Sequence, residues 1–323
     1  MNHSWPRFAL GALLALLAIS AEAQYPTKPI RIIVAVAAGG APDLAARTIA
    51  PRLGKSLGQP VVVENRGGAS GNVAGQTVAQ AAPDGYTLLL APDSHTVINP
   101  FLYKRLSFDP VKDLVPVCAV IRNQFVLAVH PSVPATTFRE FIEFARKANP
   151  PIAYASAGAG SQHQLLMELL KTRAGINMLH VPYKGGAPAV AATVAGETLA
   201  TISGGPSTAP HVRAGTLRLL ASTGGRRSET APDLPAIGEF YPGYEGTVWS
   251  ALYAPRGTPE PIIARLHEEV NAVLAENEVK ELFRRSGGTQ PYIVTRAEFG
   301  EVIQRDSEKY AKIIKDLKLA PEE

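Results

Sequence analysis

Residues 30–57 read IRIIVAVAAGGAPDLAARTIAPRLGKSL. A run of β-branched and small apolar residues is followed by the pair Gly39-Gly40, and then by apolar residues at helical spacing. This stretch predicts a buried strand, a tight glycine loop and a helix from Pro42 to Leu57. Such a unit is typical of an α/β fold, in which ligands bind at the loops that follow parallel strands.

The same order recurs further along the chain, most clearly where a strand at 152–156 leads through the glycine loop 157–161 into a helix from Gln162 to Ala174. Because βαβ units repeat, we expect parallel sheets. No Ser/Gly/Pro-rich linker separates two halves, which favours two lobes joined by strands that cross between them near Asn123 and Trp249.

The predicted lobe boundaries follow from these crossings. Residues 24–123 and 249–323 are expected to form one lobe and residues 124–248 the other, with a ligand cleft between them. Each lobe would bring one glycine loop to the cleft.

The two glycine loops have the chemistry of an anion site. Each precedes a helix, whose first backbone N–H groups lack partners and whose dipole places positive charge at that end. Asp43 and Ser161 stand in the first turn or at the N-cap, where a side-chain oxygen serves either the helix or a ligand. Both roles remain open for these two residues.

The N-terminus has the pattern of a secretory signal peptide over residues 1–23. Arg7 precedes an apolar run from Phe8 to Ile19, and Ala21-Glu22-Ala23 offers a small-x-small cleavage site. The run is shorter than the ~20 residues that span a bilayer. Cleavage would leave the formal net charge at +4, since it removes one basic and one acidic residue. The sequence thus predicts a chain exported to the periplasm.

Composition argues against several other classes. The chain has a single cysteine, Cys118, so no internal disulfide can form. Its histidines are scattered without paired ligand spacing, and we expect neither a metal nor a cofactor. No basic run with interleaved aromatic residues favours nucleic-acid binding.

Motifs spread over nearly the whole mature chain resemble those of the tripartite tricarboxylate transporter substrate-binding proteins, also called the Bordetella uptake gene family. They are KPIR at 28–31, GGAPD at 39–43, GQPVVVENR at 58–66, APDGYTLL at 82–89, INP at 98–100, YASAG at 154–158, SQH at 161–163, HVPYKG at 180–185 and PHVRAG at 210–215.

The resemblance implies a two-lobed, type II periplasmic-binding-protein fold that captures a small carboxylate and hands it to membrane permease subunits, without catalysis. Carried over residue by residue, it implies these ligand-binding residues: Gly39, Gly40, Asp43, Ser94, Gly158, Gly160, Ser161, His163, Ser203, Ser207 and Trp249. The role of His163 stays open between ligand contact and support of the loop.

Three positions depart from the family's pattern. Val36 stands where an aromatic is frequent, and Ser203 stands where Asp can occur. Asp93 occupies a position where small residues are common, and it would either cap a turn or face the cleft and select the ligand. Lys184 is the nearby candidate cation. The sequence leaves the identity of the carboxylate open.

Two other functions are alternatives to a solute-binding protein. A hydrolase using Ser161 and His163 would need a base and an orienting acid that the spacing does not establish, and GAGSQH at 158–163 replaces the third glycine of a dinucleotide fingerprint with His163. A sensory binder that docks on a receptor would share every feature described so far. We expect a monomer, because hinge closure needs no partner chain.

Overall fold

The structure is a computed structural model that describes residues 25–68 and 71–317. The predicted signal peptide, residues 1–23, lies outside the described residues. Within the described ranges, none of the helices is both long and apolar enough to cross a bilayer.

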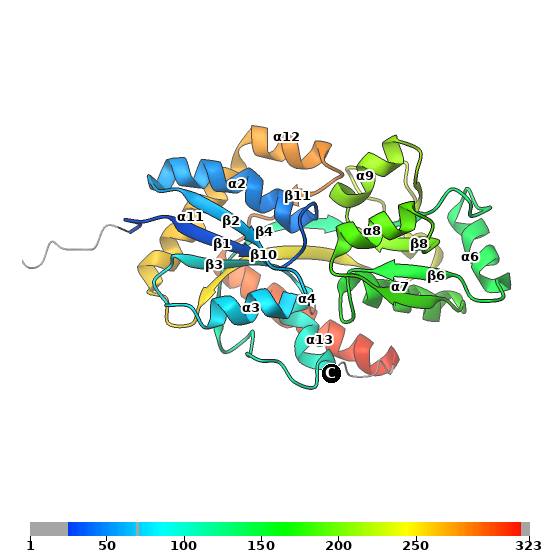
Figure 1. The fold of residues 1–323 in the computed structure, drawn as a ribbon, viewed down its shortest axis with the longest axis horizontal. Coiled ribbons are helices and arrows are strands. Elements are labelled where there is room, and N and C mark those ends of the chain that lie inside the picture. The colour runs from blue at the N-terminus through cyan, green and yellow to red at the C-terminus, as the bar shows by residue number, and fades with distance from the viewer. Residues whose placement is uncertain (1–24, 69–70, 318–323) are drawn as a thin grey trace, which may run out of the picture.

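The first lobe is built on a six-stranded sheet in the order β11-β4-β10-β3-β1-β2 (Figure 1). Its parallel part pairs β1 with β2 and with β3. The strands are β1 Ile30–Val34, β2 Val61–Asn65, β3 Thr87–Pro92, β4 Leu114–Gln124, β10 Thr247–Pro255 and β11 Gln290–Pro291. The strand that the opening sequence predicts is β1. Four of its five residues are inaccessible to solvent, because apolar residues pack on both of its faces.

The second lobe is built on a five-stranded sheet in the order β7-β6-β8-β5-β9, which Figure 1 shows beside the first. Here β6 pairs in parallel with β7 and β8, whereas β5 runs antiparallel to β8 and β9. The strands are β5 Val126–Val129, β6 Ala153–Ser156, β7 Leu179–Pro182, β8 Ala200–Ser203 and β9 Arg218–Ser222.

The expected parallel pairing holds for β1, β2 and β3 and for β6, β7 and β8, but each sheet also contains antiparallel strands and is therefore mixed. The chain leaves the first sheet along β4, passes to β5 at Phe125, and returns along β10, which pairs antiparallel with both β4 and β3. A chain that leaves along one strand and returns along its neighbour makes those strands antiparallel. The boundaries at 123/124 and 248/249 stay predictions.

Helices cover both faces of each sheet (Figure 1). Around the first sheet they are α2 Ala41–Leu57, α3 Asn72–Ala79, α4 Ser94–Val97, α5 Asn99–Leu102, α11 Glu260–Ala275, α12 Asn277–Arg285 and α13 Arg296–Leu317. Around the second they are α6 Phe138–Lys147, α7 Gln162–Ala174, α8 Gly186–Val194, α9 Gly205–Arg213 and α10 Ile237–Phe240.

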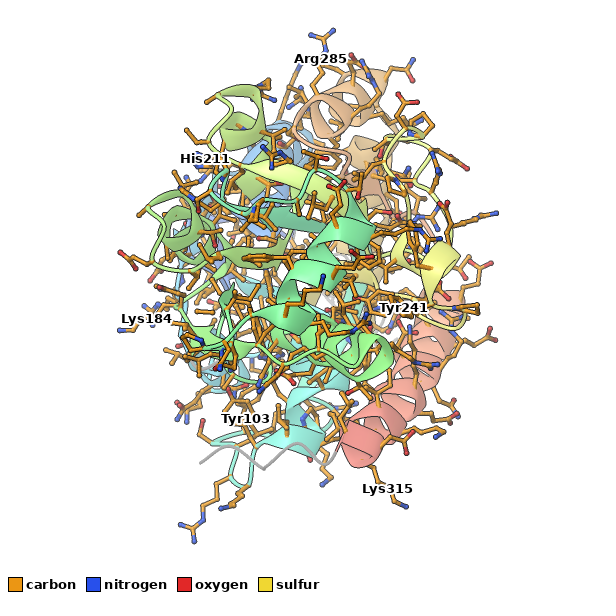
Figure 2. All side chains as sticks on the ribbon, turned by 90° about the vertical axis from the view of Figure 1, so that its right-hand side faces the viewer. Tyr103, Lys184, His211, Tyr241, Arg285 and Lys315 are labelled. Atoms are coloured by element: carbon orange, nitrogen blue, oxygen red, sulfur yellow. The ribbon has the colours of Figure 1, made fainter. Side chains whose placement is uncertain are left out.

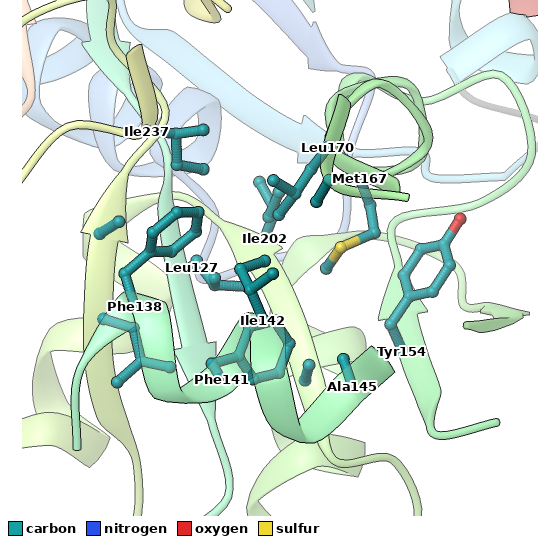
Figure 3. Close-up of a cluster of buried hydrophobic side chains, with 14 of the residues drawn as sticks. Leu127, Phe138, Phe141, Ile142, Ala145, Tyr154, Met167, Leu170, Ile202 and Ile237 are labelled. Atoms are coloured by element: carbon teal, nitrogen blue, oxygen red, sulfur yellow. The ribbon is translucent and has the colours of Figure 1, made fainter. Parts of the chain in front are cut away.

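The lobes have largely separate hydrophobic cores, although Leu165 of α7 packs into a core of the first lobe. Figure 3 shows the core of the second lobe, where Phe138, Phe141 and Ile142 of α6 pack with Leu127 and Met167. The first lobe has one core on each face of its sheet. Burying about 25 cal/mol per Å² of apolar surface stabilises each lobe separately, so the lobes can move as units.

Candidate ligand-binding site

A cavity of about 80 Å³ lies between the two lobes. This volume is the space open to the centre of a water-sized sphere, of which one water needs roughly 10–15 Å³. The cavity therefore admits a small ligand. The walls come from both lobes and from the crossing strands, and they include seven of the predicted site residues: Gly40, Ser94, Ser161, His163, Ser203, Ser207 and Trp249.

Five helices of eight or more residues begin at the wall of this cavity. Their N-cap residues all line it, namely Gly40 for α2, Gly71 for α3, Ser161 for α7, Gly185 for α8 and Gly204 for α9. Each helix start presents N–H groups without intrahelical partners and the positive end of a dipole. The cavity therefore favours an anion even though few cationic side chains surround it.

The first glycine loop is held by Asp43, which does not line the cavity. Its Oδ2 accepts a hydrogen bond from the Gly39 N–H at 2.9 Å, and its Oδ1 accepts from Arg47 Nε and Asn65 Nδ2, both at 2.9 Å. Gly39 adopts a left-handed conformation (φ 88°) and is also absent from the wall. Asp43 thus supports the loop that presents the Gly40 backbone.

The second glycine loop is arranged in the same way. Gly158 and Gly160 have φ of 122° and 74° and set the turn without lining the cavity. The Gly160 N–H donates to Gln164 Oε1 at 2.8 Å. Ser161 Oγ donates to the Gly158 carbonyl at 2.6 Å and accepts from the Gln164 N–H, so Ser161 caps α7 while also forming part of the wall.

Removing the Ser161 hydroxyl should have a modest effect. Ser161→Ala is expected to lower the free energy of unfolding by about 0.5–2 kcal/mol, because α7 loses its N-cap. Urea unfolding followed by circular dichroism measures this. Ser132→Ala, on an exposed turn, is the control. An unchanged midpoint for Ser161→Ala would mean that the cap contributes nothing.

His163 and Ser203 form a polar corner on the second-lobe side. His163 Nδ1 and Ser203 Oγ are both buried and have no hydrogen-bond partner among the described residues. Burial lowers the pKa of His163 to about 3, so the ring is neutral, and it packs on Phe125 with ring centroids 4.6 Å apart. A neutral ring and a hydroxyl can both donate a hydrogen bond to a carboxylate.

Two residues of the cavity wall, Asp93 and Lys184, have charged side chains of opposite sign. Asp93 is fully buried and both caps α4 and faces the cavity. Lys184 is exposed, and Figure 2 shows it at the edge of the molecule, so its backbone borders the cavity while its ammonium group points towards solvent. Within the described residues, no cluster of three metal-ligating side chains occurs.

Trp249 stands where the crossing strand β10 meets the cavity. Its Nε1 donates to Asp306 Oδ2 at 2.8 Å, and its ring meets Phe299 edge-on at 5.1 Å. The only other tryptophan of the sequence is Trp5, so Trp249 is the sole tryptophan of a chain that starts at Gln24. Its fluorescence is therefore a specific reporter of the site.

The two lobes touch around the cavity. Tyr103 Oη donates to the Ala159 carbonyl at 3.0 Å, and Ser207 Oγ donates to the Gly39 carbonyl at 3.3 Å. Gln162 Nε2 reaches Asp93 Oδ2 at 2.8 Å. These contacts describe a closed arrangement.

Several wall residues were not predicted from the sequence, including the N-caps Gly71, Gly185 and Gly204, and Asn123 and Phe125 at the crossing from β4 to β5. The signal for two of them was present. Gly185-Gly186 and Gly204-Gly205 each follow a short strand and precede a proline in the first helical turn, as Gly39-Gly40 does.

Comparison with known proteins finds a match between residues 45–319 and the family model described as the tripartite tricarboxylate transporter family receptor. In sequence, the chain is 35% identical over 321 residues to the protein BugT of Bordetella pertussis, covering 98% of each chain.

Solved structures agree with this. Rpa4515 of R. palustris with adipate has a TM-score of 0.88 at 33% identity, covering 92% of this chain and 100% of that one. MatC from Rhodopseudomonas palustris with bound malate has a TM-score of 0.82 at 28% identity, covering 90% and 100%. The predicted two-lobed α/β fold is confirmed.

Proposed function

We infer from one premise, that the chain belongs to the tripartite tricarboxylate transporter receptor family, that this protein captures a small carboxylate in the periplasm and delivers it to membrane permease subunits. The resemblance predicted from the motifs is thereby confirmed. Adipate and malate are carboxylates bound by similar proteins, and they motivate the ligand class proposed for this chain.

One observation carries the proposal, which is the convergence of five helix N-termini on a closed cavity. Backbone N–H groups from both lobes can donate to one carboxylate, directly or through water. Because these donors belong to different lobes, a bound carboxylate stabilises the closed arrangement over the open one.

The residues proposed to contact the ligand are those of the predicted set that line the cavity. Gly40 and Ser161 present helix starts, His163 and Ser203 offer unpartnered polar atoms, and Ser94, Ser207 and Trp249 complete the wall. Gly39, Asp43, Gly158 and Gly160 are proposed to act through the shape of the loops.

The geometry offers little to a hydrolase. The Ser161 hydroxyl donates to a backbone carbonyl, the arrangement of a helix cap rather than of a nucleophile activated by His163. Ser156 and His180 do share a hydrogen bond of 2.6 Å, but neither lines the cavity. Signalling to a receptor remains the second candidate, since closure would serve it equally.

A thermal-stability screen tests the ligand class. The chain from Gln24, stripped of bound ligand by partial unfolding, is screened against mono-, di- and tricarboxylates, aromatic acids and acidic amino acids. A ligand at 100 times its Kd should add about 2.7 kcal/mol to the stability of the native state. Inorganic sulfate at the same ionic strength is the control. If no carboxylate shifts the melting temperature, the proposed ligand class is wrong.

A further inference from the structure

The carboxylate of Asp93 is buried beside the cavity without a charged donor. Ser94 N donates to its Oδ1 at 2.7 Å, while Gln162 Nε2 at 2.8 Å and Trp249 N at 3.3 Å donate to its Oδ2. All three donors are neutral. An ionised carboxylate has about four acceptor positions, so these bonds leave capacity for one more donor.

The side-chain amide of Gln162 is fixed in orientation. Its Nε2 donates both to Asp93 and to Tyr310 Oη, each at 2.8 Å, so both amide hydrogens are used. The opposite orientation would set the carbonyl oxygen against the Asp93 carboxylate. Gln162 Oε1 is consequently a committed acceptor, and it is buried at the cavity wall with no partner among the described residues.

An unmet acceptor in such a place is destabilising, and a ligand that donates to it removes that cost. Elsewhere the wall offers mainly donors, from the helix starts. Asp93 and Gln162 instead present acceptors, one from each lobe. The cavity is thus divided into a part suited to a carboxylate and a part suited to a hydrogen-bond donor.

We propose that Asp93 and Gln162 form an acceptor pair that selects carboxylates bearing a hydroxyl or ammonium group over their unsubstituted analogues. This inference rests on the proposed function. An ammonium group has three hydrogens and can donate to both residues, so it bridges the lobes and also favours closure, whereas a hydroxyl has one hydrogen and donates to one of the two residues. The acceptor pair explains why an aspartate stands at position 93, where capping of α4 alone would not require it to face the cavity.

The charge of Asp93 gives the acceptor pair a pH dependence. The pKa of Asp93 is raised to about 7, mainly by burial and in smaller part by the charge of Asp306 on α13, while the hydrogen bonds from Gln162, Trp249 and Ser94 act in the opposite direction. The facing histidines and tyrosines stay neutral across this range, because burial lowers the pKa of His95 to about 4 and that of His163 to about 3, and raises those of Tyr253 and Tyr310. A donor prefers the ionised carboxylate, so its affinity should fall on acidification.

The test compares matched ligands by calorimetry on the chain from Gln24. For the carbon skeleton that binds in the thermal screen, the unsubstituted, 2-hydroxy and 2-amino forms are titrated at pH 8: succinate, malate and aspartate for four carbons, or propionate, lactate and alanine for three. One substituted form should bind at least about tenfold tighter than the unsubstituted one. Which of the two binds tighter identifies the donor.

Variants separate the acceptor pair from the rest of the site. Asp93→Asn should reduce the preference for the substituted over the unsubstituted ligand to less than about threefold. The Kd of the unsubstituted ligand should stay within about threefold of its wild-type value. Asp84→Asn, at an exposed turn, is the matched control and should keep the preference. Should Asp93→Asn not fold, Gln162→Met removes the other acceptor at similar volume.

The wild-type protein supplies an independent arm. From pH 8 to pH 6, the affinity for the preferred form should fall about tenfold, as a group with a pKa near 7 becomes protonated. Equal binding of all three forms, or affinity that rises on acidification, would overturn the acceptor pair while leaving carboxylate binding intact. Failure of every carboxylate in the screen would instead overturn the proposed function and this inference with it.

Discussion

Replacing Gly205 by alanine should raise the ligand Kd at least about 100-fold, which corresponds to about 2.7 kcal/mol. Gly205 begins α9 in the second lobe, and it faces Gly287 of the first lobe across the rim of the cleft. A Cβ at Gly205 would lie 1.7 Å from the Gly287 carbonyl oxygen and 2.5 Å from its carbonyl carbon. Backbone on both sides leaves no flexible side chain to move away.

The substitution should act on closure alone. Gly205 is a helical residue, so alanine suits its backbone, and the clash exists only when the lobes meet. Titration by Trp249 fluorescence measures the Kd, and small-angle scattering with saturating ligand measures closure. Gly300→Ala, whose Cβ would meet nothing within 4 Å, is the control. A Kd within threefold of the wild-type value would contradict the prediction, and would show that the backbone around Gly287 moves to accommodate the added Cβ.

Local elements were predictable because their signals are local. The helix Gln162–Ala174 was predicted with the bounds that the structure has, since apolar spacing and capping define it. Strand β4 was missed. Pro116, Arg122 and Asn123 interrupt its alternation, and it is a strand because β10 pairs along nearly its whole length.

The site was predictable only in part, for a related reason. A glycine loop before a helix can be recognised from neighbouring residues, and Gly40 and Ser161 do line the cavity. The contact between Asp93 and Gln162 joins residues 69 positions apart on different lobes, and it exists because the lobes close. Sequence spacing carries no information about a contact between lobes. The sequence therefore left open whether Asp93 caps a turn or faces the cleft, and in the structure it does both.

The core of the second lobe gives the other large expected effect. Phe141→Ala should destabilise that lobe by about 3–5 kcal/mol, because the phenyl ring is fully buried among α6, β5 and α7 and its removal leaves a cavity. For a unit of this size the loss corresponds to a melting temperature lower by about 10–20 °C. Since the cores of the two lobes are largely separate, the first lobe should keep its own transition.

Thermal melts by circular dichroism should therefore show two transitions for Phe141→Ala, and added ligand should bring them together, because binding requires both lobes folded. Phe283→Ala, at a fully buried position on α12, is the matched change in the first lobe and should lower the other transition. One cooperative transition in both variants would contradict separate cores. In that case the crossing strands β4 and β10 would couple the lobes into one unfolding unit.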